Sequence, residues 1–158
     1  MNNKKIGKKE AKLRKENEQK MREAGIRMAK ASFIRYGTAF LAVVSLYWAA
    51  TAYLVKNIYA IIPILYLLAY LFSSADQHLT IFNHKEGEFN WTYYVMIIFI
   101  VINLIILISI MINPKLVFPY FADDLKIPLI GLIVGIFIKL LIIIKIKKYR
   151  KTVGEKNV

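Results

Sequence analysis

The sequence predicts an all-α integral membrane protein with four transmembrane helices, both termini in the cytoplasm and a basic amphipathic helix at the N-terminus. Three observations support this fold class. Of the 158 residues, 58% are hydrophobic and 21% are charged, whereas about 45–50% apolar is usual in a soluble domain. The apolar residues gather in four long stretches, and the excess of basic residues, which gives a net charge of +13, lies at the two ends.

Residues 1–36 are predicted to form a basic cytoplasmic arm. They contain twelve Lys or Arg and four Glu, and each Glu precedes a basic residue by four positions, as in Glu16–Lys20 and Glu23–Arg27. This spacing stabilises helices through ion pairs. An apolar stripe follows the same helical period: Met21, Ala24, Met28 and Ala31. A basic helix with such a stripe suits an anionic inner leaflet or a partner protein.

The arm residues expected to contact lipid headgroups or a partner are basic: Lys12, Arg14, Lys20, Arg22, Arg27 and Lys30. Nucleic acid is not an expected partner, because residues 1–32 of the arm contain no aromatic side chains for base stacking and its glutamates dilute the positive field.

Four spans are predicted, each close to the ~20 apolar residues needed to cross a bilayer. They cover about residues 37–55, 58–73, 91–112 and 127–146. Together they define a transmembrane domain at 37–146, followed by a basic cytoplasmic tail at 147–158. Basic residues that flank spans are retained on the cytoplasmic side, so the charge at both ends places both termini inside and requires an even number of spans.

Small residues mark the faces on which the spans are expected to pack, because they let helix backbones approach closely in lipid. The first span has them at helical spacing: Ala42, Ser45, Ala49 and Ala52. In the fourth span, Gly131 and Gly135 form a GxxxG pattern. We expect these faces to make helix–helix contacts, either within one chain or between copies.

Two polar residues lie inside predicted spans and form a candidate intramembrane polar site. Asn103 is expected either to make an interhelical hydrogen bond or to line a polar path. Lys139 is an ionisable residue in a span, where such groups are often functional. It lies about 9 Å along the helix from Lys145, so we expect its side chain to snorkel toward the cytoplasmic interface.

Neither a catalytic site nor a cofactor is predicted. The chain has no cysteine, which excludes disulfides, thiol nucleophiles and Cys-ligated metals. His78 and His84, in a predicted inner loop at 73–90, are six residues apart, which matches no common metal-binding spacing. No nucleophile elbow, P-loop or dinucleotide fingerprint is present. We therefore expect no metal site and no enzyme.

The function expected from these features is non-enzymatic. The chain is predicted to act in a bacterial plasma membrane through contact with lipid, with a membrane-protein partner or with itself, in an accessory, assembly or protective role such as bacteriocin immunity. The alternative is a subunit of a small homo-oligomeric channel or exporter, with Asn103 and Lys139 lining the path.

Overall fold

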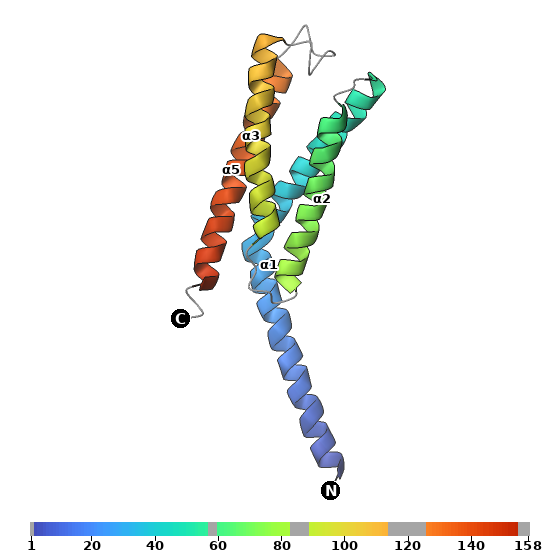
Figure 1. Cartoon of the computed structure of the whole chain (residues 1–158). Helices are drawn as coiled ribbons and strands as arrows, with labels where there is room; N and C mark the ends of the chain where they lie inside the picture. The colour runs from blue at the N-terminus through green and yellow to red at the C-terminus, as the bar shows by residue number, and fades with distance from the viewer. Residues whose placement is uncertain (1, 57–59, 83–88, 114–125, 155–158) are drawn as a thin grey trace. The chain divides into compact units, whose positions relative to one another are not determined.

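The computed structural model describes residues 2–56, 60–82, 89–113 and 126–154, with side chains from residue 13 to residue 151. These residues form an all-helical structure (Figure 1). Its helices are α1 (Asn2–Leu54), α2 (Ile61–Phe82), α3 (Asn90–Ile112) and α5 (Lys126–Gly154). The chain divides into two compact units, Met1–Ser32 and Phe33–Val158, which are described separately below.

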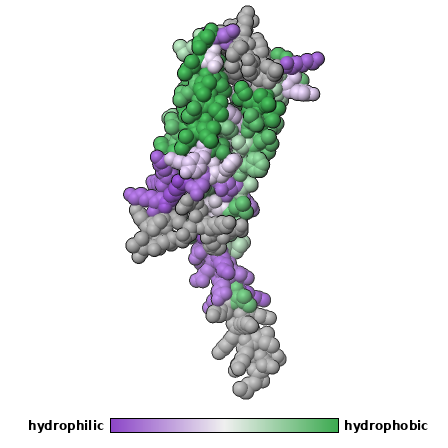
Figure 2. Space-filling model, viewed as in Figure 1, coloured by the Kyte–Doolittle hydropathy of each residue, from purple (hydrophilic) through white to green (hydrophobic). Residues whose placement is uncertain are grey.

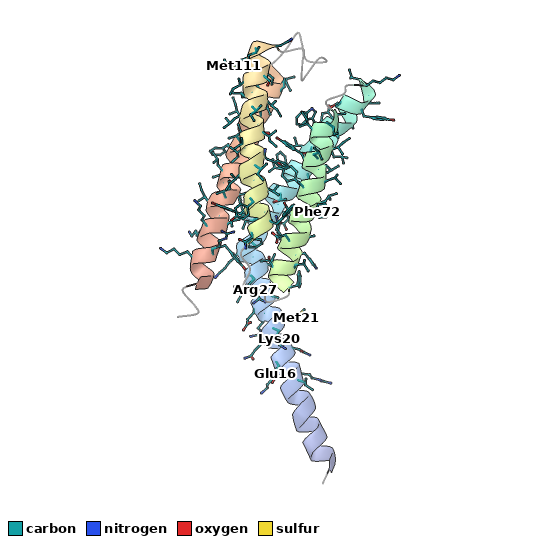
Figure 3. All side chains as sticks on the ribbon, viewed as in Figure 1. Glu16, Lys20, Met21, Arg27, Phe72 and Met111 are labelled. Carbon is teal, nitrogen blue, oxygen red and sulfur yellow. The ribbon has the colours of Figure 1, made fainter. Side chains whose placement is uncertain are left out.

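Three of the described helices have segments long and apolar enough to cross a membrane. The segments are Leu13–Leu54, Asn90–Ile112 and Lys126–Lys151. An all-α multi-pass membrane protein is therefore indicated, as the composition predicted. The space-filling view shows why: hydrophobic side chains cover much of the visible face of the helices (Figure 2). Exposed apolar residues such as Phe72 and Met111 lie on this outer surface (Figure 3).

The second helix differs from its predicted span. Helix α2 begins at Ile61 and continues to Phe82, so the expectation of a loop from residue 73 is wrong for residues 73–82. Its last turns are polar in sequence, but Ser73, Gln77 and Thr80 are buried and extend one face of the helix. Polar side chains that bond to neighbouring helices allow this helix to continue. Residues 58 and 59, where the span was predicted to begin, lie outside the described residues.

Helices α3 and α5 begin within one residue of the predicted spans at 91 and 127. Helix α5 ends at Gly154, so part of the predicted basic tail is helical. Lys and Arg are good helix formers, and positive charge is favourable near a helix C-terminus. The remaining tail, the remaining inner loop at 83–88 and the outer-loop residues 114–125 lie outside the described residues.

The unit Met1–Ser32 is highly charged, and its residues 2–32 are helical. The predicted ion pair between Glu23 and Arg27 is formed, with Arg27 Nη1 lying 3.8 Å from Glu23 Oε2. The side chain of Met21 is 75% exposed, and Figure 3 labels it beside Glu16 and Lys20. The unit therefore offers both basic and apolar side chains on its surface.

In the unit Phe33–Val158, α1 and α3 are antiparallel to α2, and α3 is antiparallel to α5. Thr38 of α1 bonds to Gln77 of α2, and Arg150 of α5 donates a hydrogen bond of 2.8 Å to Asn90 of α3. The last residues of α5 thus lie at the same end as the first residues of α3. We call this end the basic end, after six residues that lie at or near it: Arg35, Lys145, Lys147, Lys148, Arg150 and Lys151.

Toward the opposite end, the bundle is held by aliphatic packing between α3 and α5. Ile106, Ile110 and Leu132 form a buried cluster, with Trp48 of α1 and Ile62 of α2 packed against it. Near the basic end α1 and α5 meet at Gly37, where a Cβ atom would lie 3.0 Å from Ile142 Cδ1. Gly37 therefore allows these two helices to pack directly, a role that the sequence analysis missed.

Candidate functional site

The first polar site lies inside the bundle and joins α2, α3 and α5. We call it the central cluster and define it as Tyr66, Asn103, Gly135 and Lys139. The hydroxyl of Tyr66 donates a hydrogen bond of 2.8 Å to Asn103 Oδ1. Asn103 therefore makes an interhelical hydrogen bond, one of the two roles expected for it, and such a bond is worth about 0.6–2 kcal/mol in a membrane.

Lys139 belongs to the same cluster and is almost fully enclosed, with 2% of its surface exposed. Its Nζ atom lies 5.7 Å from the centroid of the Tyr66 ring, within the range of a cation–π interaction. The same atom lies 3.6 Å from the point that a Cβ atom on Gly135 would occupy. Among the described side chains, no carboxylate forms an ion pair with Lys139.

The expectation that Lys139 snorkels to the interface is wrong. Side chains on an α-helix lean toward its N-terminus, and on α5 that direction leads from Lys139 toward Gly135, away from the basic end. The distance along the helix to Lys145 was short enough, but the direction was opposite. The direction of α5 therefore points the Lys139 side chain away from the basic end, and the rotation of α5, which turns this residue toward Tyr66, places it inside the bundle.

Aromatic rings surround the central cluster. The Tyr66 ring stacks on Phe99 with 4.0 Å between centroids, and the edges of Tyr70 and Trp48 meet it at 6.2 and 6.0 Å. Sequence reasoning missed Tyr66 as a site residue. A signal was available, because Tyr66 lies in the middle of the predicted second span, whereas membrane tyrosines favour the ends.

The second polar site lies nearer the basic end and is centred on Thr92. We call it the Thr92 cluster and define it by residues of three helices: Thr38, Ser73, Asp76, Gln77 and Thr92. Gln77 Nε2 donates to Thr38 Oγ1 at 2.9 Å and to Thr92 Oγ1 at 3.4 Å. The cluster thus ties α1, α2 and α3 together.

Within the Thr92 cluster, Asp76 caps the start of α3 from a different helix. Its Oδ2 atom accepts bonds from the Thr92 backbone N–H at 3.2 Å and from the Thr92 hydroxyl at 3.0 Å. Phe89, which precedes α3, has a left-handed backbone (φ 44) and makes no side-chain cap. The first N–H groups of a helix need an acceptor, and a negative charge is favourable there. Asp76 supplies both.

The predicted packing residues are distributed over several environments. Ser45, Ala49 and Ala52 are buried on one face of α1, while Ala42 is half-buried and Leu41 is buried beside it. Gly135 faces Asn103 and Lys139, but a Cβ atom on Gly131 would have nothing within 4 Å. The two glycines of the GxxxG pattern therefore do not share one contact in this chain.

The predicted contact residues of the arm are mostly on the surface. Arg14, Lys20, Arg22 and Lys30 are exposed and Arg27 is half-buried, while the Lys12 side chain lies outside the described residues. His78 is exposed on α2, and His84 lies outside the described residues. In the described part of the chain, no three His, Cys, Asp or Glu side chains gather as a metal-binding group.

In both clusters, polar side chains of different helices are hydrogen-bonded to one another. Asp76 belongs to one cluster and Lys139 to the other, and the clusters lie about 16 Å apart along α2, from Tyr66 to Gln77. The described carboxylate and amine therefore do not form an acid–base pair. No protein-family model, curated protein or solved structure matches the chain, so function is inferred from these residues.

Proposed function

We propose that the chain is a four-span protein of a bacterial plasma membrane that acts by contact with another membrane protein and not by catalysis. The observation that carries this proposal is the use of the interior polar groups. Tyr66 bonds to Asn103, and Gln77 and Asp76 bond to Thr92. These groups hold helices together, so they favour a structural framework over a reaction site. Accessory, assembly and immunity-type roles all belong to this class.

A fourth span at α2 is supported by its length and its partners. Its 22 residues correspond to about 33 Å of helix, close to the thickness of the hydrocarbon core. Asp76 and Gln77, two of the polar residues that lower its hydropathy, are hydrogen-bonded to neighbouring helices. Lipid tolerates polar side chains in a span where they face the bundle interior and find partners.

A cytoplasmic location for both termini is supported by the basic end. The start of α3 and the last turns of α5 meet there, and Lys145 Nζ lies 5.6 Å from the ring centroid of Phe33 in α1. Positive residues next to spans favour the cytoplasmic side. Parts of α1, α3 and α5 therefore share one end of the unit, as four alternating spans with cytoplasmic termini would place them.

This topology is testable by cysteine labelling, because the chain contains no cysteine of its own. With Asn3→Cys and Asn157→Cys, we expect a membrane-impermeant maleimide to react only after the cells are permeabilised. With Asn113→Cys, at the end of α3, we expect reaction in intact cells. Labelling of positions 3 and 157 on opposite sides would overturn the four-span arrangement.

The surface proposed for contact is the unit Met1–Ser32. It combines exposed basic residues with exposed apolar ones, of which Leu13, Met21 and Ile26 are examples. A photo-crosslinking amino acid at Met21 is expected to give a covalent adduct with one membrane protein in living cells. The matched control at Leu46, an exposed apolar residue of the predicted first span, is expected to give mainly lipid adducts. Lipid adducts alone at both positions would contradict a protein partner.

A channel between copies of the chain is less well supported. Such a path would be lined by side chains on the outer surface of each copy. Asn103 and Lys139, the residues expected to line it, are 3% and 2% exposed in a single chain. The oxygen of Asn103 is also bonded to Tyr66. Their placement fits a site enclosed by one chain better than a path shared by several.

A further inference from the structure

Two hydrogen-bond donors converge beside Gly135 in the central cluster. Asn103 Nδ2 and Lys139 Nζ each lie 3.6 Å from the position of a Cβ atom on Gly135. The two nitrogen atoms are therefore separated by no more than twice that distance. They come from different helices, α3 and α5, and both side chains are buried. The space that glycine leaves open is thus bordered by donors on two sides.

The tyrosine hydroxyl fixes which end of the Asn103 amide faces this space. Because Tyr66 donates to Oδ1, the NH₂ group is turned toward Gly135 and Lys139. An amide NH₂ offers two donors and a lysine ammonium offers three, and neither group accepts a hydrogen bond. The position beside Gly135 is therefore rich in donors.

Among the residues that the structure describes, none provides an anionic partner for this position. None of the four predicted spans contains Asp or Glu, and Asp76 of α2 is bonded to Thr92 in the other cluster. A buried ammonium group without a counter-charge is unfavourable in a low-dielectric interior. An anion from outside the chain would supply the counter-charge.

We propose that the central cluster binds a small monovalent anion of halide size between Lys139 Nζ and Asn103 Nδ2, beside Gly135. One negative charge balances one lysine, and a small ion matches a site enclosed by helices and aromatic rings. Tyr66 acts as a positioning residue, since its hydroxyl orients the amide. The bound ion links α3 to α5 and stabilises the bundle. This inference does not depend on the proposed contact function.

The test uses the purified full-length chain in detergent with bromide as the probe. Trp48 lies 6.0 Å from the Tyr66 ring, so its fluorescence reports on the cluster. The chain has two tryptophans, and Trp91→Phe leaves Trp48 alone. Bromide is titrated at constant ionic strength by replacing gluconate. We expect the Trp48 fluorescence to change and the Tm to rise, and both responses to reach a plateau as the bromide concentration increases.

The decisive variants are Gly135→Ala and its matched control Gly131→Ala. The new methyl group at position 135 lies at an ordinary contact distance of 3.6 Å from both nitrogen atoms, so the fold is expected to tolerate it while the ion is displaced. At position 131 a Cβ atom meets nothing within 4 Å. We expect Gly135→Ala to weaken bromide binding by at least about tenfold, equivalent to 1.4 kcal/mol, and Gly131→Ala to leave it unchanged.

A second pair of variants tests whether bromide responds to the charge of Lys139 in particular or to the positive charge of the chain in general. Lys139→Met is expected to abolish the saturable response, and Lys145→Met, on the same helix at the basic end, is expected to preserve it. Helical circular dichroism checks that each variant is folded, and Gly135→Ala keeps the test decisive if Lys139→Met does not fold. The proposal is overturned if the parent shows no saturable response, or if Gly135→Ala and Gly131→Ala respond alike.

Discussion

Tyr66→Ala is expected to destabilise the bundle by about 3–5 kcal/mol, the range observed when a large buried aromatic side chain is removed. The substitution deletes the ring that packs against Phe99, Tyr70 and Trp48. It also leaves Asn103 Oδ1 without its donor. The measurement is the free energy of unfolding in mixed micelles, followed by helical circular dichroism as the fraction of SDS is raised.

Two further variants separate the ring from the hydroxyl. Tyr66→Phe keeps the ring contacts and removes one interhelical hydrogen bond, so a loss of about 0.6–2 kcal/mol is expected. Tyr47→Ala alters a tyrosine that is 71% exposed on α1, and we expect little change in stability. Equal losses for Tyr66→Ala and Tyr47→Ala would show that the central cluster does not hold the helices together.

Asp76→Ala is expected to destabilise the bundle by about 1–2 kcal/mol, the upper part of the range for removing a helix cap. The carboxylate accepts two bonds from Thr92 at the first turn of α3. When it is removed, the Thr92 N–H loses its acceptor, and the start of α3 loses a negative charge. The free energy of unfolding is measured in the same micelles. Amide hydrogen exchange at the start of α3 measures how often this part of the helix opens locally.

A double-mutant cycle shows whether the loss of stability in Asp76→Ala comes from the contact between Asp76 and Thr92. Thr92→Val removes the hydroxyl, and the combined loss in Asp76→Ala/Thr92→Val is expected to be smaller than the sum of the two single losses. His78→Ala, which changes an exposed residue of the same helix, is the control and should have little effect. Fully additive losses would contradict a direct coupling between Asp76 and Thr92.

The helical membrane fold was accessible from the sequence because it depends on local properties. Apolar length and charge distribution are enough to place segments in lipid, since every backbone group must bond within its own helix there. Helix α3 illustrates this, with its observed start one residue from the predicted one. The end of α2 was not predictable in this way, because Asp76 and Gln77 look like loop residues until Thr38 and Thr92 are placed beside them.

The amino-acid sequence by itself determined the helical class, the apolar segments and the concentration of positive charge at both ends. Only the tertiary structure decided that Lys139 points into the bundle, that Tyr66 meets Asn103 and that Gly135, but not Gly131, faces them. The physical reason is that hydropathy belongs to one segment of chain, whereas a hydrogen bond between helices depends on their relative rotation and register. Residues 37 positions apart, as Tyr66 and Asn103 are, become partners only when those two quantities are fixed by packing.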